Sequence, residues 1–250
     1  MLIRYGYEIT LIYQQPTALV CLLSVHEDRA ADIRVPETTF TNPDVAISTY
    51  RDLFGNRCRR LVAPAGDLTM WGDATIEDDG RPDRIAPNAQ EAPVPDLPDD
   101  SLVYLFGTFA PGWGRVQAIC DFVHNHIHFD YMKARSTRTA FEVYHKRVGV
   151  CRDFAHLAVA FCRCLNIPTR YVNGYLGDIG VPVVDPMDFS AWIDVFLEGE
   201  WHTFDPRAAD RQDRRCTGPR CHRHPPHQLV RPTCPEGFLV WTYEVPEPIG

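Results

Sequence analysis

The amino-acid sequence predicts an α+β fold in which a small β-sandwich is followed by a helix packed on an antiparallel sheet. Three observations predict it. Near the start of the chain, apolar and polar residues alternate, as in half-buried strands. Residues 77–100 are rich in proline and acidic residues and show almost no apolar periodicity. After them, apolar residues recur every three or four positions, which is typical of amphipathic helices, and strand-like runs then return.

Residues 1–76 are predicted to form the N-terminal β-sandwich domain. The first strand lies around residues 3–9, where every second residue is Ile or Tyr. Many short strands joined by turns are typical of two packed sheets. The further strand-like runs are residues 17–25, 46–50, 58–62, 68–71 and 74–76.

The stretch at residues 77–100 is predicted to be a linker between two domains. It contains five prolines, which lack a backbone N–H and fix φ, together with many acidic residues. Such a composition favours an extended chain over a helix or a strand. We therefore place the domain boundary here and predict a second domain over residues 101–210.

The second domain is predicted to contain two amphipathic helices and three strands. One helix begins near Pro111 and continues to about residue 127, and the other covers residues 151–165. Glu198-Gly199 predicts a tight hairpin between the last two strands. The strand-like runs are residues 170–176, 191–197 and 201–204.

Residues 211–250 are predicted to be an atypical tail that ends in a short strand. Between positions 211 and 235 there are six Arg, five Pro, three Cys and three His, and almost no residues that could build a core. Zinc coordination would give such a stretch a reason to fold, but the Cys and His spacing matches no standard ligand pattern, so no metal is predicted. A disordered tail and a shifted reading frame are the alternatives.

The composition argues against several classes of protein. A net charge of −8 disfavours a protein that binds nucleic acid by neutralising phosphates. The longest early apolar run, Ala18–Val25, is too short to cross a membrane and lacks the basic leader of a signal peptide. The nine cysteines have no regular spacing, which favours free thiols in a reducing compartment, and we expect a cytoplasmic location. No glycine-rich phosphate loop is present in the sequence, so no organic cofactor is predicted.

One cysteine lies where a nucleophile would need to be. Gly149 allows a sharp turn, and Cys151 then occupies the first turn of the second predicted helix. There the unpaired backbone N–H groups and the helix dipole stabilise a thiolate and lower its pKa, while Asp153 complements the dipole. Position alone leaves a second interpretation open, in which Cys151 is one more buried cysteine.

Four sequence motifs in order favour the first interpretation. They are Gly-Val-Cys-Arg-Asp-Phe-Ala-His at 149–156, Ile-Pro-Thr-Arg-Tyr-Val-Asn-Gly-Tyr at 167–175, Ala-Trp-Ile-Asp-Val at 191–195 and Trp-His-Thr-Phe-Asp-Pro at 201–206. Together they strongly resemble the transglutaminase-like superfamily, over about residues 101–210. The resemblance implies a papain-like core with a Cys-His-Asp arrangement. The β region before the linker is similar to the N-terminal domain of bacterial members.

The resemblance assigns roles to three positions. Cys151 matches the nucleophile of the family, and Asp205 matches the aspartate that orients the catalytic base. The catalytic histidine should directly precede Ala191, and this position is Ser190. Serine cannot act as a general base at neutral pH, so Ser190 marks the place of the expected histidine without its chemistry.

Two other sets of histidines are weaker candidates for function. His156 lies five residues after Cys151, about 140° around the same helix, and is expected to point away from it. The alternating histidines at 124, 126 and 128 could ligate a metal on one strand face. We expect them instead to form a solvated junction between a helix and a strand.

His202 is excluded as the base by the alternation of side chains in the predicted hairpin. With a two-residue turn, Val195 pairs with His202 and Trp192 pairs with Asp205. Ser190 and Asp205 are then diagonal neighbours on one face of the sheet, and His202 lies on the other face. A shift of the register by one residue would reverse this.

These residues predict thiol-dependent acyl transfer at an amide. Cys151 would attack the carbonyl carbon of a carboxamide or peptide bond in a protein or peptide substrate, giving an acyl-enzyme. Water would release the acyl group in a peptidase or amidase, and an amine would release it in a transglutaminase. The alternative is a catalytically impaired or inactive binding protein that keeps the fold, because Ser190 stands in the histidine position.

Overall fold

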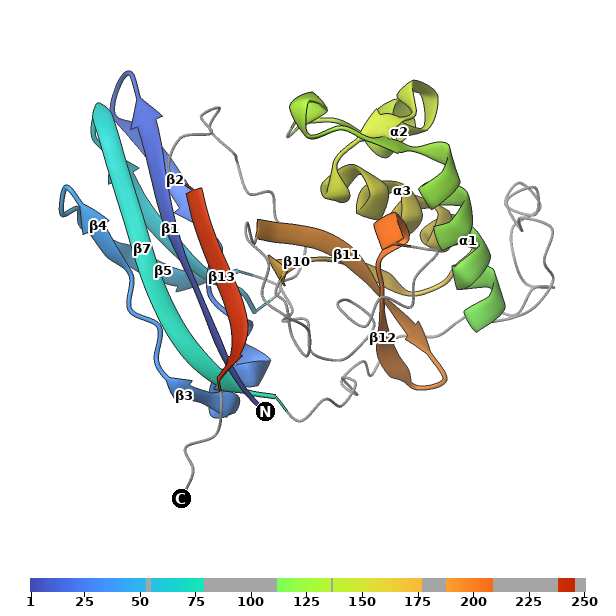
Figure 1. Ribbon diagram of the computed structural model, residues 1–250, viewed down its shortest axis with the longest axis horizontal. Helices are drawn as coiled ribbons and strands as arrows, with labels where there is room; N and C mark the ends of the chain where they lie inside the picture. The colour runs from blue at the N-terminus through green and yellow to red at the C-terminus, as the bar shows by residue number, and fades with distance from the viewer. Residues whose placement is uncertain (53–54, 79–111, 136, 177–187, 209–237, 246–250) are drawn as a thin grey trace. The chain divides into compact units, whose positions relative to one another are not determined.

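The computed structural model describes residues 1–52, 55–78, 112–135, 137–176, 188–208 and 238–245 (Figure 1). This part of the chain divides into two compact units. The first unit holds residues 1–78, 174–176, 188–189 and 238–245, and the second holds 112–173 and 190–208. Most of the predicted linker and the Cys- and His-rich stretch of the tail lie outside the described residues.

The first unit contains two antiparallel sheets that share one core, which is the predicted β-sandwich. Its strands are β1 (Leu2–Tyr13), β2 (Thr17–Cys21), β3 (Ile33–Val35), β4 (Phe40–Asn42), β5 (Ser48–Arg51), β6 (Arg57–Ala63), β7 (Gly66–Glu77) and β13 (Phe238–Val245). One sheet has the order β13-β1-β7-β3, with β4 also paired to β7. The other has the order β2-β6-β5.

The alternation predicted for the first strand is confirmed in β1. Ile3, Tyr5 and Tyr7 are at most 1% exposed and lie in the sandwich core. Arg4 is exposed, and it forms an ion pair with Asp73 of β7. Burying apolar surface contributes roughly 25 cal/mol per Å², so this stripe of large side chains is a main source of stability for the unit.

Two features of this sheet do not follow from the alternation of apolar and polar residues. Residues 68–71 and 74–76, which were expected as separate strands, belong to one strand, β7, because its backbone pairs with β1 along its whole length. The last strand, β13, pairs antiparallel with the other side of β1. Strand β13 therefore lies next to β1 in this sheet, although the two strands are far apart in the sequence.

Residues that follow position 173 also contribute to the first unit. Tyr175 and Phe189 are buried in the sandwich core. The Tyr175 hydroxyl donates to the Leu23 carbonyl oxygen at 2.7 Å. Burial raises the pKa of Tyr175 well above its ordinary value, so the hydroxyl keeps its proton and this hydrogen bond at physiological pH.

The second unit packs its helices against a sheet, as the sequence predicts (Figure 1). The helices are α1 (Trp113–His126), α2 (Ala140–Lys146) and α3 (Cys151–Cys164). The strands are β8 (His128–Phe129), β9 (Val148–Gly149), β10 (Thr169–Leu176), β11 (Asp188–Leu197) and β12 (Glu200–Phe204). The last three form a sheet in the order β10-β11-β12, in which β11 and β12 are antiparallel. Side chains of α1, α3 and β11 share one core.

The two predicted helices are confirmed as α1 and α3, with ends that differ by no more than two residues. The apolar stripe of α1 is fully buried at Val116, Ile119 and Val123. The hairpin turn is confirmed as well, because Glu198 and Gly199 have φ angles of +53° and +91°, as in a type I′ turn. No helix among the described residues is long and apolar enough to cross a membrane.

The short helix α2 is a feature that the apolar spacing did not predict. A capping box starts it: the Thr139 hydroxyl accepts from the Glu142 N–H at 3.2 Å, and the Glu142 carboxylate accepts from the Thr139 N–H at 3.1 Å. The signature Thr-x-x-Glu is visible in the sequence. A helix of seven residues, however, has too few turns to show a clear apolar period.

Candidate functional site

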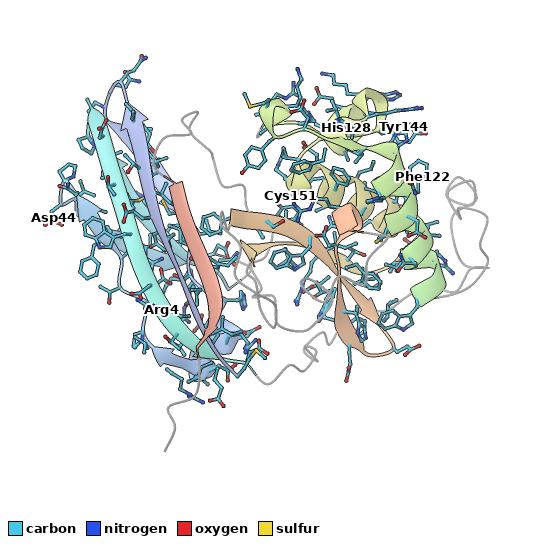
Figure 2. The ribbon with its side chains drawn as sticks, in the orientation of Figure 1. Arg4, Asp44, Phe122, His128, Tyr144 and Cys151 are labelled. Atoms are coloured by element: carbon cyan, nitrogen blue, oxygen red, sulfur yellow. The ribbon has the colours of Figure 1, made fainter. Side chains whose placement is uncertain are left out.

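Cys151 is the first residue of α3 (Figure 2). Its side chain is partly exposed and packs against the core of the second unit. The preceding residue, Val150, has an extended backbone, and its carbonyl oxygen accepts from the Asp153 N–H at 2.7 Å. The first N–H groups of a helix have no acceptor within it and favour negative charge nearby. Cys151 therefore lies at the N-terminus of α3, where these N–H groups are found.

Burial distinguishes Cys151 from other described cysteines. Burial raises the pKa of Cys162 to about 12 and that of Cys21 to about 11, and it raises the pKa of Cys120 well above its ordinary value. These three thiols keep their protons at neutral pH. Cys164 is exposed and is the last residue of α3, at the opposite end of the helix from Cys151.

Gly149 is required because the start of α3 comes very close to it. A Cβ atom added at this position would lie 2.6 Å from Asp153 Oδ2, well inside van der Waals contact. Gly149 also pairs with Phe129 in the short parallel ladder of β8 and β9, and its carbonyl oxygen accepts from the Asp130 N–H at 3.0 Å. Glycine is therefore needed here for close approach.

Asp153 lies fully buried in the same helical turn as Cys151. Its Oδ2 accepts from the Val150 N–H and from Arg138 Nη1, both at 3.0 Å. Its Oδ1 accepts from Arg152 Nη1 at 3.2 Å. Burial raises the pKa of this carboxyl, and the Val150 N–H and the two arginines oppose that rise. The carboxylate thus joins the residue before Cys151 to the residue after it.

The same two arginines attach the preceding segment to the start of α3. Arg138 is 7% exposed and donates to the carbonyl oxygens of Lys133 at 2.6 Å and Val148 at 2.8 Å. Arg152 donates to those of Arg135 at 2.7 Å and Arg138 at 2.9 Å. Arg152 lies inside the motif at 149–156, whereas Arg138 lies outside the four motifs, so the sequence carries no signal for its contact with the start of α3.

Asp205 directly precedes the 3₁₀ helix η5 (Pro206–Ala208), which packs against α1 and α3. Its side chain is only 3% exposed. Oδ1 accepts from the Arg207 N–H at 2.9 Å, and Oδ2 lies 3.7 Å from Arg207 Nη2. The Arg207 guanidinium lies 5.7 Å from the centroid of the Phe129 ring. The carboxylate expected to orient a base is thus held by Arg207, whose side chain reaches the β8–β9 pair beside Cys151.

Ser190 is 2% exposed, and its hydroxyl makes no hydrogen bond with a described residue. The indole N–H of Trp192 is likewise buried without an acceptor. Ala191 lies in the core shared with the helices, so by strand alternation its neighbours point to the other face. The ladder of β11 and β12 stops short of the predicted Trp192–Asp205 pair. Among the described residues, no hydrogen bond or ion pair joins Cys151, Ser190 and Asp205.

The hairpin of β11 and β12 has the register that the sequence predicts. Val195 lies opposite His202, and the paired ladder ends at Ile193 and Phe204. Val195 is part of the core shared with the helices, so His202 lies on the same face as that core. Its ring centroid is 4.5 Å from that of Trp113 in α1. His202 is therefore packed against α1.

Three other histidines make packing or backbone contacts. The His156 ring packs edge-on against Tyr171 with centroids 4.9 Å apart, and burial lowers the pKa of His156 to about 4. His124 and His126 each place a ring nitrogen near a backbone carbonyl oxygen, at 2.8 and 2.7 Å. Within the described ranges, no histidine makes a hydrogen bond or ring contact with Cys151.

The described residues contain no group of three or more His, Cys, Asp or Glu side chains arranged to hold a metal ion. His124 and His126 make the backbone contacts given above. The Cys- and His-rich stretch at 211–235 lies outside the described residues, and the alternatives for it stay open.

Comparisons with known proteins relate the chain to one family. A family model for the transglutaminase-like superfamily matches residues 108–206. The crystal structure of a candidate cysteine protease from Cytophaga hutchinsonii is 25% identical, with a TM-score of 0.66 over 87% of this chain and 80% of that chain. An uncharacterized protein of Mycobacterium leprae is 42% identical over 65 residues, which are 25% of this chain and 23% of that protein. An uncharacterized protein of Mycobacterium tuberculosis is 30% identical over 133 residues, 48% of this chain and 42% of that protein.

The matched parts of the chain span less than half the length of either mycobacterial protein. The family match itself includes Cys151, Ser190 and Asp205. The second unit has the helix and antiparallel sheet that the family resemblance implies, and the similar crystal structure covers most of the chain. Residues 108–206 therefore match the transglutaminase-like superfamily.

Proposed function

We propose that this protein transfers acyl groups from amides through the thiol of Cys151. The observation that carries the proposal is the position of Cys151, which is partly exposed and begins α3 within a transglutaminase-like core. The thiolate would add to the carbonyl carbon and form a C–S bond. As the tetrahedral intermediate collapses, the C–N bond breaks, and the amine leaves with one proton from water, which balances the proton that the thiol released when it ionised.

The substrate that we propose is a protein or peptide that presents a carboxamide or a peptide bond. Water would release the acyl group as a carboxylic acid, and an amine would release it as a new amide. The similarity to a candidate cysteine protease supports the reaction with water. The described cysteines are all free thiols, which suits a reducing cytoplasm, and we propose that location.

Ser190 favours a second function, that of a binding protein with impaired catalysis. The leaving amine must gain a proton and the attacking water must lose one, and histidine normally performs both steps. Ser190 has no group that titrates near neutral pH, and its hydroxyl is buried. Such a protein would keep the fold and bind a peptide without turning it over.

Hydroxylamine trapping of an acyl-thioester separates the two functions. The full chain is incubated with a glutaminyl peptide and hydroxylamine, which converts a thioester into a hydroxamate. Acyl transfer predicts hydroxamate from the wild type and from Cys164→Ala, and none from Cys151→Ala. Cys164→Ala is the matched control because it removes the exposed thiol at the other end of the same helix. If the wild type binds the peptide but forms no more hydroxamate than Cys151→Ala, the protein is a binding protein.

A further inference from the structure

Three charged side chains meet at the first turn of α3: Arg138, Arg152 and Asp153. All are largely withdrawn from water, with side chains 8%, 17% and 0% exposed. Two guanidinium groups and one carboxylate carry a formal net charge of +1. The acyl-transfer proposal assigns these residues no role, although two of them directly follow Cys151.

By itself, Asp153 would oppose a thiolate at Cys151. The two residues share the first helical turn, and a nearby negative charge raises the pKa of a thiol. The helix N-terminus acts in the opposite direction, with roughly half a positive charge. Arg138 and Arg152 reverse the balance, because together they more than neutralise the carboxylate.

The charged groups on neighbouring elements do not replace these arginines. Asp205 and Arg207, next to and within η5, form an ion pair with each other. Arg135 forms an ion pair with Glu142 of α2. His128 of β8 is the titratable side chain on the strand that pairs with β9. Asp130, whose backbone N–H donates to the Gly149 carbonyl oxygen, accepts from the Met132 N–H through its carboxylate at 2.9 Å. Arg138, Arg152 and Asp153 together leave a formal net positive charge at the first turn of α3.

The same groups also fix the backbone on both sides of Cys151. The Asp153 carboxylate holds the Val150 N–H, and the Arg152 guanidinium holds two carbonyl oxygens of the segment before α2. Arg138 completes the connection through the Val148 carbonyl oxygen. Both the charge and the geometry at the nucleophile thus depend on the two arginines.

We propose that Arg138 and Arg152 are positioning residues for Cys151. They neutralise Asp153, hold its carboxylate against the Val150 N–H, and keep the first turn of α3 positive beside the Cys151 thiol. This inference rests on the proposed function, because it concerns the same nucleophile.

The test measures the rate of Cys151 alkylation by iodoacetamide from pH 5 to 10, on the full chain, by peptide mass spectrometry. In Arg138→Met and Arg152→Met, the pH at which the alkylation rate is half of its maximum should rise by about one pH unit. We call this pH the midpoint. At pH 7 a smaller fraction of the thiol would be ionised, so alkylation should become slower. The expected loss is about threefold to tenfold, because the more basic thiolate is also more nucleophilic and offsets part of the effect. Arg138→Lys keeps the charge and should keep the wild-type midpoint. Arg135→Met, which removes a nearby exposed guanidinium, is the matched control and should also leave the midpoint unchanged.

Asp153→Asn should shift the midpoint in the opposite direction. It removes the negative charge and should therefore lower the midpoint. If Arg138→Met does not fold, the midpoint of Arg152→Met tests the proposal, because the Arg152 side chain is less buried than that of Arg138. A purely structural role would change the rate at high pH and leave every midpoint at the wild-type value, and that result overturns the proposal. If the wild-type Cys151 does not react at any pH, both this inference and the proposed function fail.

Discussion

The start of α3 and the start of β11 carry the two halves of the candidate site, and they differ in how their polar groups are satisfied. Around Cys151, the buried Asp153 accepts three hydrogen bonds, and Gly149 leaves room for its carboxylate. At β11, the buried hydroxyl of Ser190 and the indole N–H of Trp192 have no hydrogen-bond partner among the described residues. A buried polar group without a partner costs about 1–3 kcal/mol.

The difference bears on the two steps of the proposed acyl transfer. Forming an acyl-enzyme on a good leaving group needs a thiolate, and the helix N-terminus supplies the setting for one. Releasing the acyl group needs proton transfer to and from water, and serine at position 190, where the family resemblance implies a histidine, cannot perform it. We therefore expect Cys151 to accept acyl groups readily and to release them slowly.

Placing a histidine at position 190 should have the largest effect on amide turnover. If position 190 serves the base, as the family resemblance implies, Ser190→His should raise amide turnover by about 10²-fold or more, since a missing general acid–base lowers rates by roughly 10²–10⁴. Ser190→Asn is the control, because it fills similar space without a titratable ring. The measurement is kcat/KM on one peptide amide. An equal rise in both variants, or no rise with His, would show that position 190 does not serve the base.

Disturbing the surroundings of Cys151 should have the second largest effect, seen in the stability of the fold and in the rate of Cys151 alkylation. Gly149→Ala places a Cβ 2.6 Å from Asp153 Oδ2, so the carboxylate or the helix must shift. We expect a loss of about 1–3 kcal/mol in the free energy of unfolding, as for other overpacked sites. Cys151 alkylation at pH 7 should also slow. Urea denaturation checks the first effect, and an unchanged midpoint would contradict the close approach.

A smaller effect is expected at α2, which packs against α3. Thr139→Ala removes the hydroxyl that caps this helix and should cost about 1 kcal/mol of stability. Because the change does not touch the groups around Cys151, the alkylation rate at pH 7 should stay at the wild-type value. A slower rate would show that α2 itself helps to hold the nucleophile.

The smallest effect on reactivity is expected at His156. Its pKa is lowered by burial to about 4, so the folded protein binds this proton only at acidic pH, whereas the unfolded chain binds it near pH 6.5. Stability should therefore fall as the pH drops from 6.5 towards 4, and His156→Gln should reduce that slope. Between pH 6 and 9, the same variant should leave the pH profile of Cys151 alkylation unchanged. A shifted profile would make His156 a candidate base.

The parts of the fold that depend on neighbouring residues could be predicted from the sequence. The burial alternation of β1, the apolar stripes of α1 and α3, and the positive-φ turn at Glu198-Gly199 all follow from local spacing. The pairing of β13 with β1 and the burial of Tyr175 in the sandwich core could not. Both depend on contacts between segments that are far apart in the chain.

The same distinction applies to the candidate site. A glycine followed by a cysteine at the start of a helix is a local pattern, and the structure places Cys151 there. Arg138 meets Asp153 only because the segment before α2 folds back onto α3. No spacing rule connects these two residues, so a single sequence carries no signal for their ion pair.

We expect Cys151 to be acylated quickly and deacylated slowly. Rapid mixing with p-nitrophenyl acetate tests it most directly, because this leaving group needs no proton. We predict a burst of about one p-nitrophenolate per chain, an acetyl group that peptide mass spectrometry locates on Cys151, and slow turnover afterwards. Linear release without a burst, or an acetyl group on any other residue, would contradict the account.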